Sequence, residues 1–259
     1  MKKVIVVILL ALVIGIVIAV VVRMSSGPQT QMGSIKMSEP SLGAKIFAGI
    51  TAPFTSGNTE IQRTIEARKN VKSFRMKTLL QLHPGHPLET VVEVSCPDRE
   101  RFTTTIGDRA FHAVRIGGKA YTEQENGAWS VQDTPAQGWA PCGDNPGEPA
   151  PWAVMNEGRD PSSVLAKVIG SSEITRGAFV GTDSGNCRQW TMSVKLPGGA
   201  AHGHGASGLH YTVCIDPSQH LPVAVVMGSG GMVTTYFDWN KPIQIEAPKV
   251  EESAVILVP

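Results

Sequence analysis

The chain has 259 residues, of which 42% are hydrophobic and 6% aromatic, and its formal net charge at pH 7 is +1. A near-neutral chain without a basic stripe offers no electrostatic attraction to nucleic acid, which excludes nucleic acid as an expected partner. The frequent glycine (27) and proline (18) are typical of a turn-rich β protein.

An unbroken apolar run from Val4 to Val22 follows Lys2 and Lys3. As a helix this run spans roughly 28 Å, close to the hydrocarbon thickness of a bilayer. The paired lysines favour a cytoplasmic N-terminus. We therefore predict a transmembrane signal anchor at residues 1–23, with the rest of the chain outside the cytoplasm. The alternative is a cleaved signal peptide, which places the domain in the same compartment.

A Ser/Gly/Pro-punctuated segment at residues 24–56 is predicted to be a tether that packs in part on the domain. A short helix follows, with Asn58 or Thr59 as its N-cap and an end near Asn70. Ile61 and Ile65 give this helix one apolar edge. The folded domain is predicted to span residues 57–248, with a C-terminal tail at 249–259.

Strands are indicated from Val71 onward, where the hydrophobic period changes to two. Turn pairs such as Gly117-Gly118 and Asn126-Gly127 predict tight hairpins between successive strands. A Pro/Gly-rich loop over 134–151 and a helix from Asp160 to Gly170 separate two meanders. The predicted strands cover residues 71–82, 89–96, 99–106, 109–116, 119–123, 128–131, 173–182, 186–196, 209–216, 221–228 and 232–239.

Four cysteines in an extracytoplasmic domain suggest two disulfides, although four free buried thiols are the alternative. If 186–196 and 209–216 form a hairpin with Trp190 opposite Tyr211, then Met192 lies opposite Leu209 and Cys187 opposite Cys214. That register brings the two cysteines within disulfide reach. We therefore predict a Cys187–Cys214 bond, which leaves Cys96 and Cys142 as the second pair by elimination.

The histidines are the obvious candidates for metal binding, at His202, His204 and His210. Their loop is rich in glycine and contains no carboxylate or cysteine, which argues against a preorganised metal site. We therefore expect no metal and no cofactor.

Residues for catalysis are no better grouped, because the chain contains neither a G-x-S-x-G elbow nor a phosphate-binding loop. Asp98 and Glu100 alternate with Arg99 and Arg101, which favours a salt-bridged rim over a catalytic carboxylate pair. We expect no catalytic residues and no enzyme activity.

Apolar strand faces are the remaining signal, because only two convincing helices outside the anchor are available to cover them. A curved sheet that is incompletely covered leaves an apolar cavity, whereas a fully packed core is the alternative. Strand phase predicts the cavity-lining residues as Phe74, Met76, Leu80, Val92, Val94, Phe102, Trp190 and Tyr211.

Short motifs over residues 57–248 make the chain resemble the lipoprotein-carrier superfamily, the LolA/LolB-like fold of lipid-binding envelope lipoproteins. The matching segments are residues 71–76, 96–102, 116–121, 126–129, 215–217, 221–223 and 236–248. The resemblance implies an α+β fold, in which a curved antiparallel half-barrel of about 10 strands has short helices covering its concave face. Such carriers are not enzymes, and they hold acyl chains in a hydrophobic cavity.

The function that follows is a binder or carrier of lipid or of lipidated protein, held by its transmembrane helix. The expected location is the bacterial cytoplasmic (inner) membrane, single-pass, with the domain in the periplasm or outside. The alternative is an envelope protein-interaction or stress-sensing module on the same fold, which binds a partner polypeptide.

Overall fold

The computed structural model describes residues 32, 34–51, 55–83, 86–134, 173–194, 209–227 and 231–250. The predicted anchor at 1–23 and the predicted helix at 160–170 lie outside these residues. Within the described part, the elements are β1 (Met37–Ser38), α2 (Leu42–Thr51), α3 (Gly57–Lys69), β2 (Ser73–His83), β3 (His86–Ser95), β4 (Arg99–Ile106), β5 (Arg109–Ile116), β6 (Lys119–Glu123), β7 (Trp129–Asp133), β8 (Glu173–Thr182), β9 (Gly185–Val194), β10 (Leu209–Ile215), β11 (Pro222–Met227) and β12 (Met232–Phe237).

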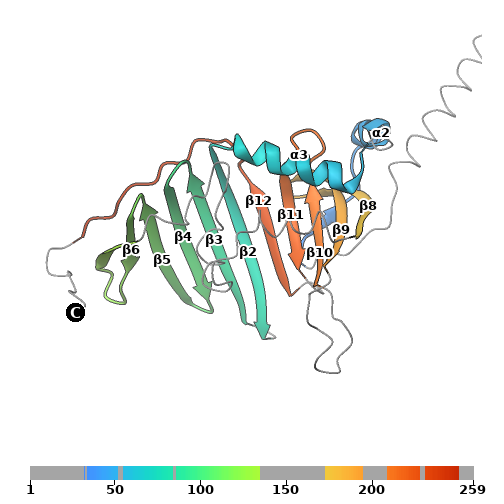
Figure 1. The fold of residues 1–259 in the computed structure, drawn as a ribbon. Helices are drawn as coiled ribbons and strands as arrows, with labels where there is room; N and C mark the ends of the chain where they lie inside the picture. Colours follow the sequence, from blue (N-terminus) through green and yellow to red (C-terminus); the bar gives the residue numbers. More distant parts are fainter. Residues whose placement is uncertain are drawn as a thin grey trace, which may run out of the picture.

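All twelve described strands belong to one antiparallel sheet, in the order β1-β8-β9-β10-β11-β12-β2-β3-β4-β5-β6-β7. The sheet is open and curled (Figure 1), which is consistent with the predicted half-barrel. It has more strands than the predicted ten or so, and the two-residue β1 has no counterpart among the predicted strands. The pairing of β12 with β2 joins the C-terminal meander to the N-terminal one.

The hairpin turns follow from the sequence as predicted. Gly117 and Gly127 have φ angles of +56° and +81°, a region that glycine enters without steric cost. These glycines occupy the turns between β5 and β6 and between β6 and β7. Strands β4, β5, β6 and β8 begin and end at the predicted residues.

The two faces of the sheet carry different cores, because side chains alternate along each strand. We call one side the α3 face, because Ile61 of α3 packs there with Trp190 and Met192. The other is the disulfide face, where Cys187 and Cys214 lie in an apolar cluster with Met32. Met32, which belongs to the segment predicted as a tether, therefore packs on the disulfide face, whereas helix α3 packs on the α3 face.

Helix α3 begins two or three residues earlier than predicted, because Ser56 is its N-cap. The Ser56 Oγ accepts a hydrogen bond from the Thr59 backbone N–H at 3.2 Å. Glu60 in the first turn is buried, and its Oε1 lies 2.8 Å from Nδ1 of His220 in the turn between β10 and β11. This contact fixes the helix to the sheet across 160 residues of sequence.

The predicted Cys187–Cys214 disulfide is confirmed, with a Cα–Cα distance of 5.3 Å. The predicted register is wrong by two residues, because Trp190 pairs with Val213, and Cys214 pairs with Gln189. A shift of two preserves the face of every side chain. The cysteines therefore stay on one face and bond diagonally between β9 and β10.

In the described residues, no helix is long and apolar enough to cross a membrane.

Replacing both Cys187 and Cys214 with alanine is expected to destabilise the domain by about 3.5 kcal/mol, on loop-entropy grounds for a 27-residue separation. Urea unfolding of the oxidised protein and of the double variant measures the difference. An unchanged midpoint would contradict a stabilising role for this bond.

Candidate functional site

The α3 face carries all eight residues that the sequence predicted as cavity-lining. Phe74, Met76, Val92, Val94, Phe102 and Trp190 are buried, whereas Leu80 and Tyr211 are partly exposed. Strand register sets Met76 opposite Val92, and Val92 opposite Phe102. Six of the eight predicted residues belong to β2, β3 and β4, and they therefore lie on the same face of three adjacent strands. Whether they line a cavity stays a prediction.

Two apolar clusters make up this face. One lies on β2, β3 and β4 and includes Phe74 and Met76, with Ala67 of α3 packed against it. The other lies on β9 and β10 and includes Trp190 and Val213, with Ile65 of α3 packed against it. In Figure 1, α3 crosses β9 to β12 and ends near β2, so a single helix covers parts of both clusters.

A row of four threonines crosses the α3 face beside the cluster on β2, β3 and β4. Thr234, Thr78, Thr90 and Thr104 are directly opposed on β12, β2, β3 and β4. The Oγ1 atoms of Thr78 and Thr234 are 3.0 Å apart, and those of Thr90 and Thr104 are 3.2 Å apart. Each hydroxyl pair uses one hydrogen internally, so one hydroxyl hydrogen per pair remains able to donate to another group.

Two arginine side chains lie on the α3 face beside Trp190. Arg176 pairs with Trp190 between β8 and β9, and Arg188 lies two residues before Trp190 on the same side. The Arg188 side chain is buried and donates from Nη1 to the Gly177 carbonyl at 3.2 Å. Burial, together with the nearby charge of Arg176, lowers the pKa of Arg188 to about 10. Sequence analysis missed this pair, because their proximity depends on the β8–β9 register.

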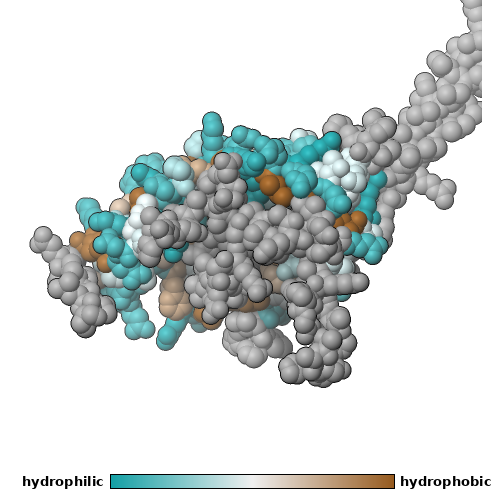
Figure 2. All heavy atoms as spheres, in the orientation of Figure 1, coloured by the Kyte–Doolittle hydropathy of each residue, from teal (hydrophilic) through white to brown (hydrophobic). Residues whose placement is uncertain are grey.

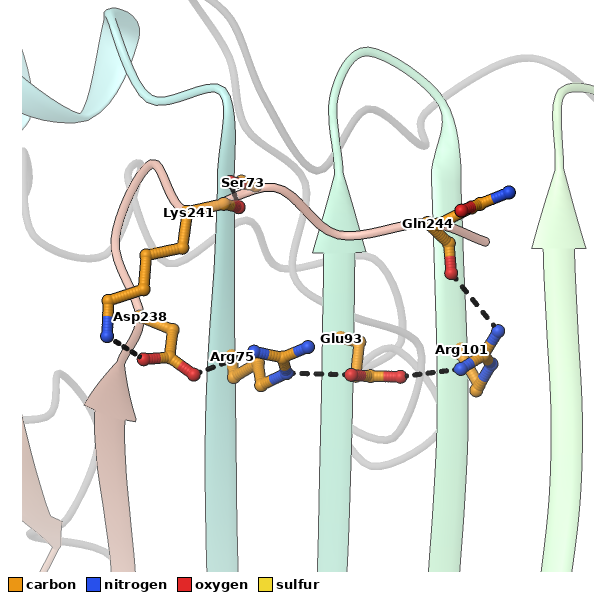
Figure 3. Close-up of polar contacts among 7 residues, drawn as sticks. All are labelled: Ser73, Arg75, Glu93, Arg101, Asp238, Lys241 and Gln244. Carbon is orange, nitrogen blue, oxygen red and sulfur yellow. Dashed lines mark hydrogen bonds and ion pairs between the residues drawn. The ribbon is translucent and has the colours of Figure 1, made fainter. Parts of the chain in front are cut away.

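The disulfide face carries a chain of ion pairs over β12, β2, β3 and β4 (Figure 3). Arg75 donates from Nε to Glu93 at 2.7 Å and from Nη1 to Asp238 at 2.7 Å. Glu93 also accepts from Arg101 at 2.9 Å, and Lys241 donates to Asp238 at 2.6 Å. Arg101, which the sequence placed in a salt-bridged rim, therefore forms its described ion pair with Glu93.

The C-terminal segment 238–250 crosses the ends of β2, β3 and β4 (Figure 1). The Ser73 hydroxyl donates to the Lys241 carbonyl, and Arg99 donates to the Ile245 carbonyl at 2.8 Å. Arg101 donates to the Gln244 carbonyl at 3.3 Å, as Figure 3 also shows. The Ile245 side chain is buried. These contacts hold the segment in place as part of the domain.

Exposed apolar side chains occur at one end of the α3 face. Ile106 at the end of β4 is 45% exposed, and Phe111 on β5 is 50% exposed. The register places Ile106 opposite Arg109, and Phe111 opposite Thr104. On the side drawn in Figure 2, the described hydrophobic surface forms separate patches among hydrophilic residues.

Two further predictions concern residues that the structure describes only in part. His202 and His204 lie outside the described residues, whereas His210 contacts the Ser193 hydroxyl through Nδ1 at 3.0 Å. Cys96 is disulfide-bonded, and its predicted partner Cys142 lies outside the described residues.

No protein-family model matches the chain, and no curated protein matches it. Among solved structures, lipoprotein LppX of Mycobacterium tuberculosis is 15% identical, with a TM-score of 0.48 over 73% of this chain and 97% of that chain. LprF of Mycobacterium bovis is 15% identical, with a TM-score of 0.45 over 82% and 99%. A Vibrio parahaemolyticus domain described as an outer membrane lipoprotein-sorting protein is 9% identical, with a TM-score of 0.25 over 71% and 93%.

LppX is described as a lipoprotein, and the Vibrio parahaemolyticus domain is described as a lipoprotein-sorting domain. Because the identities and TM-scores are this low, the function proposed below rests on the residues of this chain.

Changing Glu93 to Gln is expected to cost about 1–2 kcal/mol, because a partly buried carboxylate then no longer pairs with two arginines. Glu89→Gln is the matched control on the same strand, since among the described residues Glu89 pairs with one cation, the more exposed Lys77. The control is expected to cost about 0.5 kcal/mol or less. Equal losses in urea unfolding would contradict a special role for the Glu93 pairs.

The Asp238 carboxylate gives an expected pH dependence. Hydrogen bonds from Lys241, and then from Arg75, hold the pKa of Asp238 below its ordinary value of 3.8. A lowered folded-state pKa stabilises the fold above pH 3.8, and that contribution is lost as the pH falls through the folded-state value. The stability gap between wild type and Asp238→Asn is therefore expected to be full at neutral pH and to shrink in acid. A gap that stays constant down to unfolding would contradict this origin.

Proposed function

We propose that the domain is a non-enzymatic binder or carrier that holds the acyl chains of lipids or lipoproteins against its α3 face. The observation that carries the proposal is the composition of that face. Two apolar clusters lie on the same side of one sheet, and hydroxyl groups cross it at a defined row. Ligand sites for apolar molecules combine mostly hydrophobic lining with a few placed polar groups.

The apolar clusters of the α3 face suit the alkyl chain of an acyl lipid, and the threonine row suits its carbonyl group. Burying one methylene group of an alkyl chain contributes about 0.8 kcal/mol, so a chain of ordinary length gains affinity from apolar contact alone. The threonine row supplies uncharged donors, which suit an ester or amide carbonyl at the head of an acyl chain. An acyl chain lying over Met76 and Val92 would have its carbonyl within the adjacent threonine row, because Thr78 and Thr90 are the next residues on that face.

The disulfide supports a location outside the cytoplasm, since such bonds persist in oxidising compartments. Together with the predicted anchor at Val4 to Val22, this favours a carrier held at the outer surface of the bacterial inner membrane. Such a tethered domain receives lipid from, or passes lipid to, partners within reach of its anchor.

Leu80→Ser is expected to weaken binding of a fluorescent diacylglycerol about tenfold or more, because Leu80 is a partly exposed member of the α3 face. Val91→Ser is the matched control, since Val91 lies on the neighbouring strand but faces the other way. Fluorescence titration of both variants measures the difference. Equal affinities in the two variants would place the ligand elsewhere.

The double change Thr78→Val and Thr234→Val tests the polar row. Replacing both members of a buried hydroxyl pair with apolar groups of the same shape is nearly neutral for stability. Affinity for a diacylglycerol is expected to fall about fivefold, whereas affinity for a plain alkane probe is expected to stay unchanged. Parallel changes for both probes would show that the hydroxyls do not contact the ester.

A second candidate function is a protein-interaction module, favoured by the exposed Ile106 and Phe111 at one end of the α3 face. Large apolar side chains exposed together are typical of contact surfaces. Wild-type diacylglycerol affinity in Leu80→Ser would shift support to this candidate.

A further inference from the structure

A pocket of about 270 Å³ lies on the disulfide face, away from the proposed acyl-chain site. Its floor is apolar and is formed by side chains of β2, β11 and β12, among them Leu79, Ala224 and Val233. One wall is the N-terminal segment Ser34 to Lys36, and the other is the turn Thr182 to Ser184 between β8 and β9. The pocket therefore has an apolar base with polar walls.

Both walls are held in place by described contacts. Strand β1 pairs with β8 through Met37 and Thr182, directly beside the pocket. A Cβ added at Gly181 would meet the Ser38 hydroxyl at 2.5 Å, so the two segments pack closely. In the turn, the Thr182 hydroxyl donates to the Gly185 carbonyl at 2.8 Å and accepts from the Ser184 backbone N–H at 3.2 Å. The walls are thus fixed by the fold before any ligand binds.

Two ammonium groups at the pocket can bind an anionic group, and the carboxylates of Asp183 and of the neighbouring Glu89 balance their charge. Lys36 and Lys77 contribute two ammonium groups, and Asp183 contributes one carboxylate. Lys77 is paired with Glu89 at 2.7 Å, but an ammonium group has three hydrogens to donate. Lys36 is exposed at the wall. An anionic head group that reaches these lysines would keep its attached chain over the apolar floor.

The volume of the pocket and its location relative to the membrane further restrict which ligands are expected to bind. The pocket is slightly smaller than the range of about 300–1,000 Å³ typical of drug-sized ligands, so one alkyl chain suits it better than two. The apolar run of the predicted anchor ends at Val22, and Met32 is already buried on this face. The nine residues from 23 to 31 reach at most about 32 Å when extended, which would keep the pocket near the membrane surface.

We propose that this pocket binds a single-chain fatty acid, with its alkyl chain over Leu79, Ala224 and Val233 and its carboxylate at Lys36 and Lys77. The site is independent of the proposed acyl-chain site, because it lies on the opposite face of the sheet. The protein would then sense or store free fatty acid at a place separate from its carrier surface.

The test uses the full chain in phosphatidylcholine nanodiscs and a decanoate analogue with a photoreactive diazirine at its chain end. After irradiation, mass spectrometry maps the labelled residues. Labelling is expected on the segments that contain Leu79, Ala224 and Val233, and excess decanoate should suppress it more strongly than uncharged decanol. Labelling that decanol suppresses equally well would overturn the role of the lysines.

Two variants test the contacts of the ligand's alkyl chain and of its carboxylate separately. Leu79→Trp fills the pocket from a partly exposed position and is expected to reduce labelling about tenfold. Lys36→Glu reverses an exposed charge and is expected to reduce labelling about fivefold. Lys249→Glu, an exposed lysine outside the pocket lining, is the matched control and is expected to label as wild type does.

The outcomes distinguish this pocket from the proposed function. Label only on α3-face residues such as Phe74 and Met76 would overturn the pocket and leave the carrier function supported. Label on the disulfide face that persists unchanged in Leu79→Trp and in Lys36→Glu would also overturn it. Label confined to the pocket, together with unaltered diacylglycerol binding in Leu80→Ser, would support the pocket and remove the carrier site.

Discussion

The pairing of β12 with β2 is the constraint on which the rest of the structure depends, because it joins two meanders into one sheet. We call this pairing the seam, and side-chain contacts stabilise it on both faces of the sheet. On the α3 face, Thr234 and Thr78 share a hydrogen bond, and on the disulfide face Asp238 pairs with Arg75. The C-terminal segment adds a third fastening, because the Lys241 carbonyl accepts from Ser73. A continuous α3 face that spans both apolar clusters exists only while this seam is closed.

The α3 face is also where the domain departs from an ordinary apolar core. Arg188 and Glu100 are buried there, and burial lowers the pKa of Arg188. Burying charged groups costs free energy that apolar residues of similar size would not cost. Natural proteins retain such destabilising buried charges mainly at functional sites. The placement of these groups on the side with the threonine row therefore agrees with a binding role for this face.

Alternation along the chain predicted the elements and their faces well, because the period of two is a local property. Strands β4, β5, β6 and β8 are examples, and Cys187 and Cys214 share a face as expected. Register is not local, and the same alternation fits Trp190 opposite either Tyr211 or Val213. The threonine row and the Arg176–Arg188 pair depend on register across several strands, so no single segment indicates them. Strand β1 is too short to produce a period, and Ser56 competed as N-cap with two similar residues nearby.

The attachment of β1 has a mechanical consequence. Only Met37 and Ser38 pair with β8, at the outermost edge of the sheet, whereas the neighbouring β9 and β10 are covalently cross-linked. Tension applied through the N-terminal segment would therefore load the buried Met32 and then this two-residue pairing, and β1 would peel away while the cross-linked strands stay paired. Such peeling would remove one wall of the pocket on the disulfide face without unfolding the sheet. The domain would thus contain a weak link that yields under load at the point where the chain leaves it.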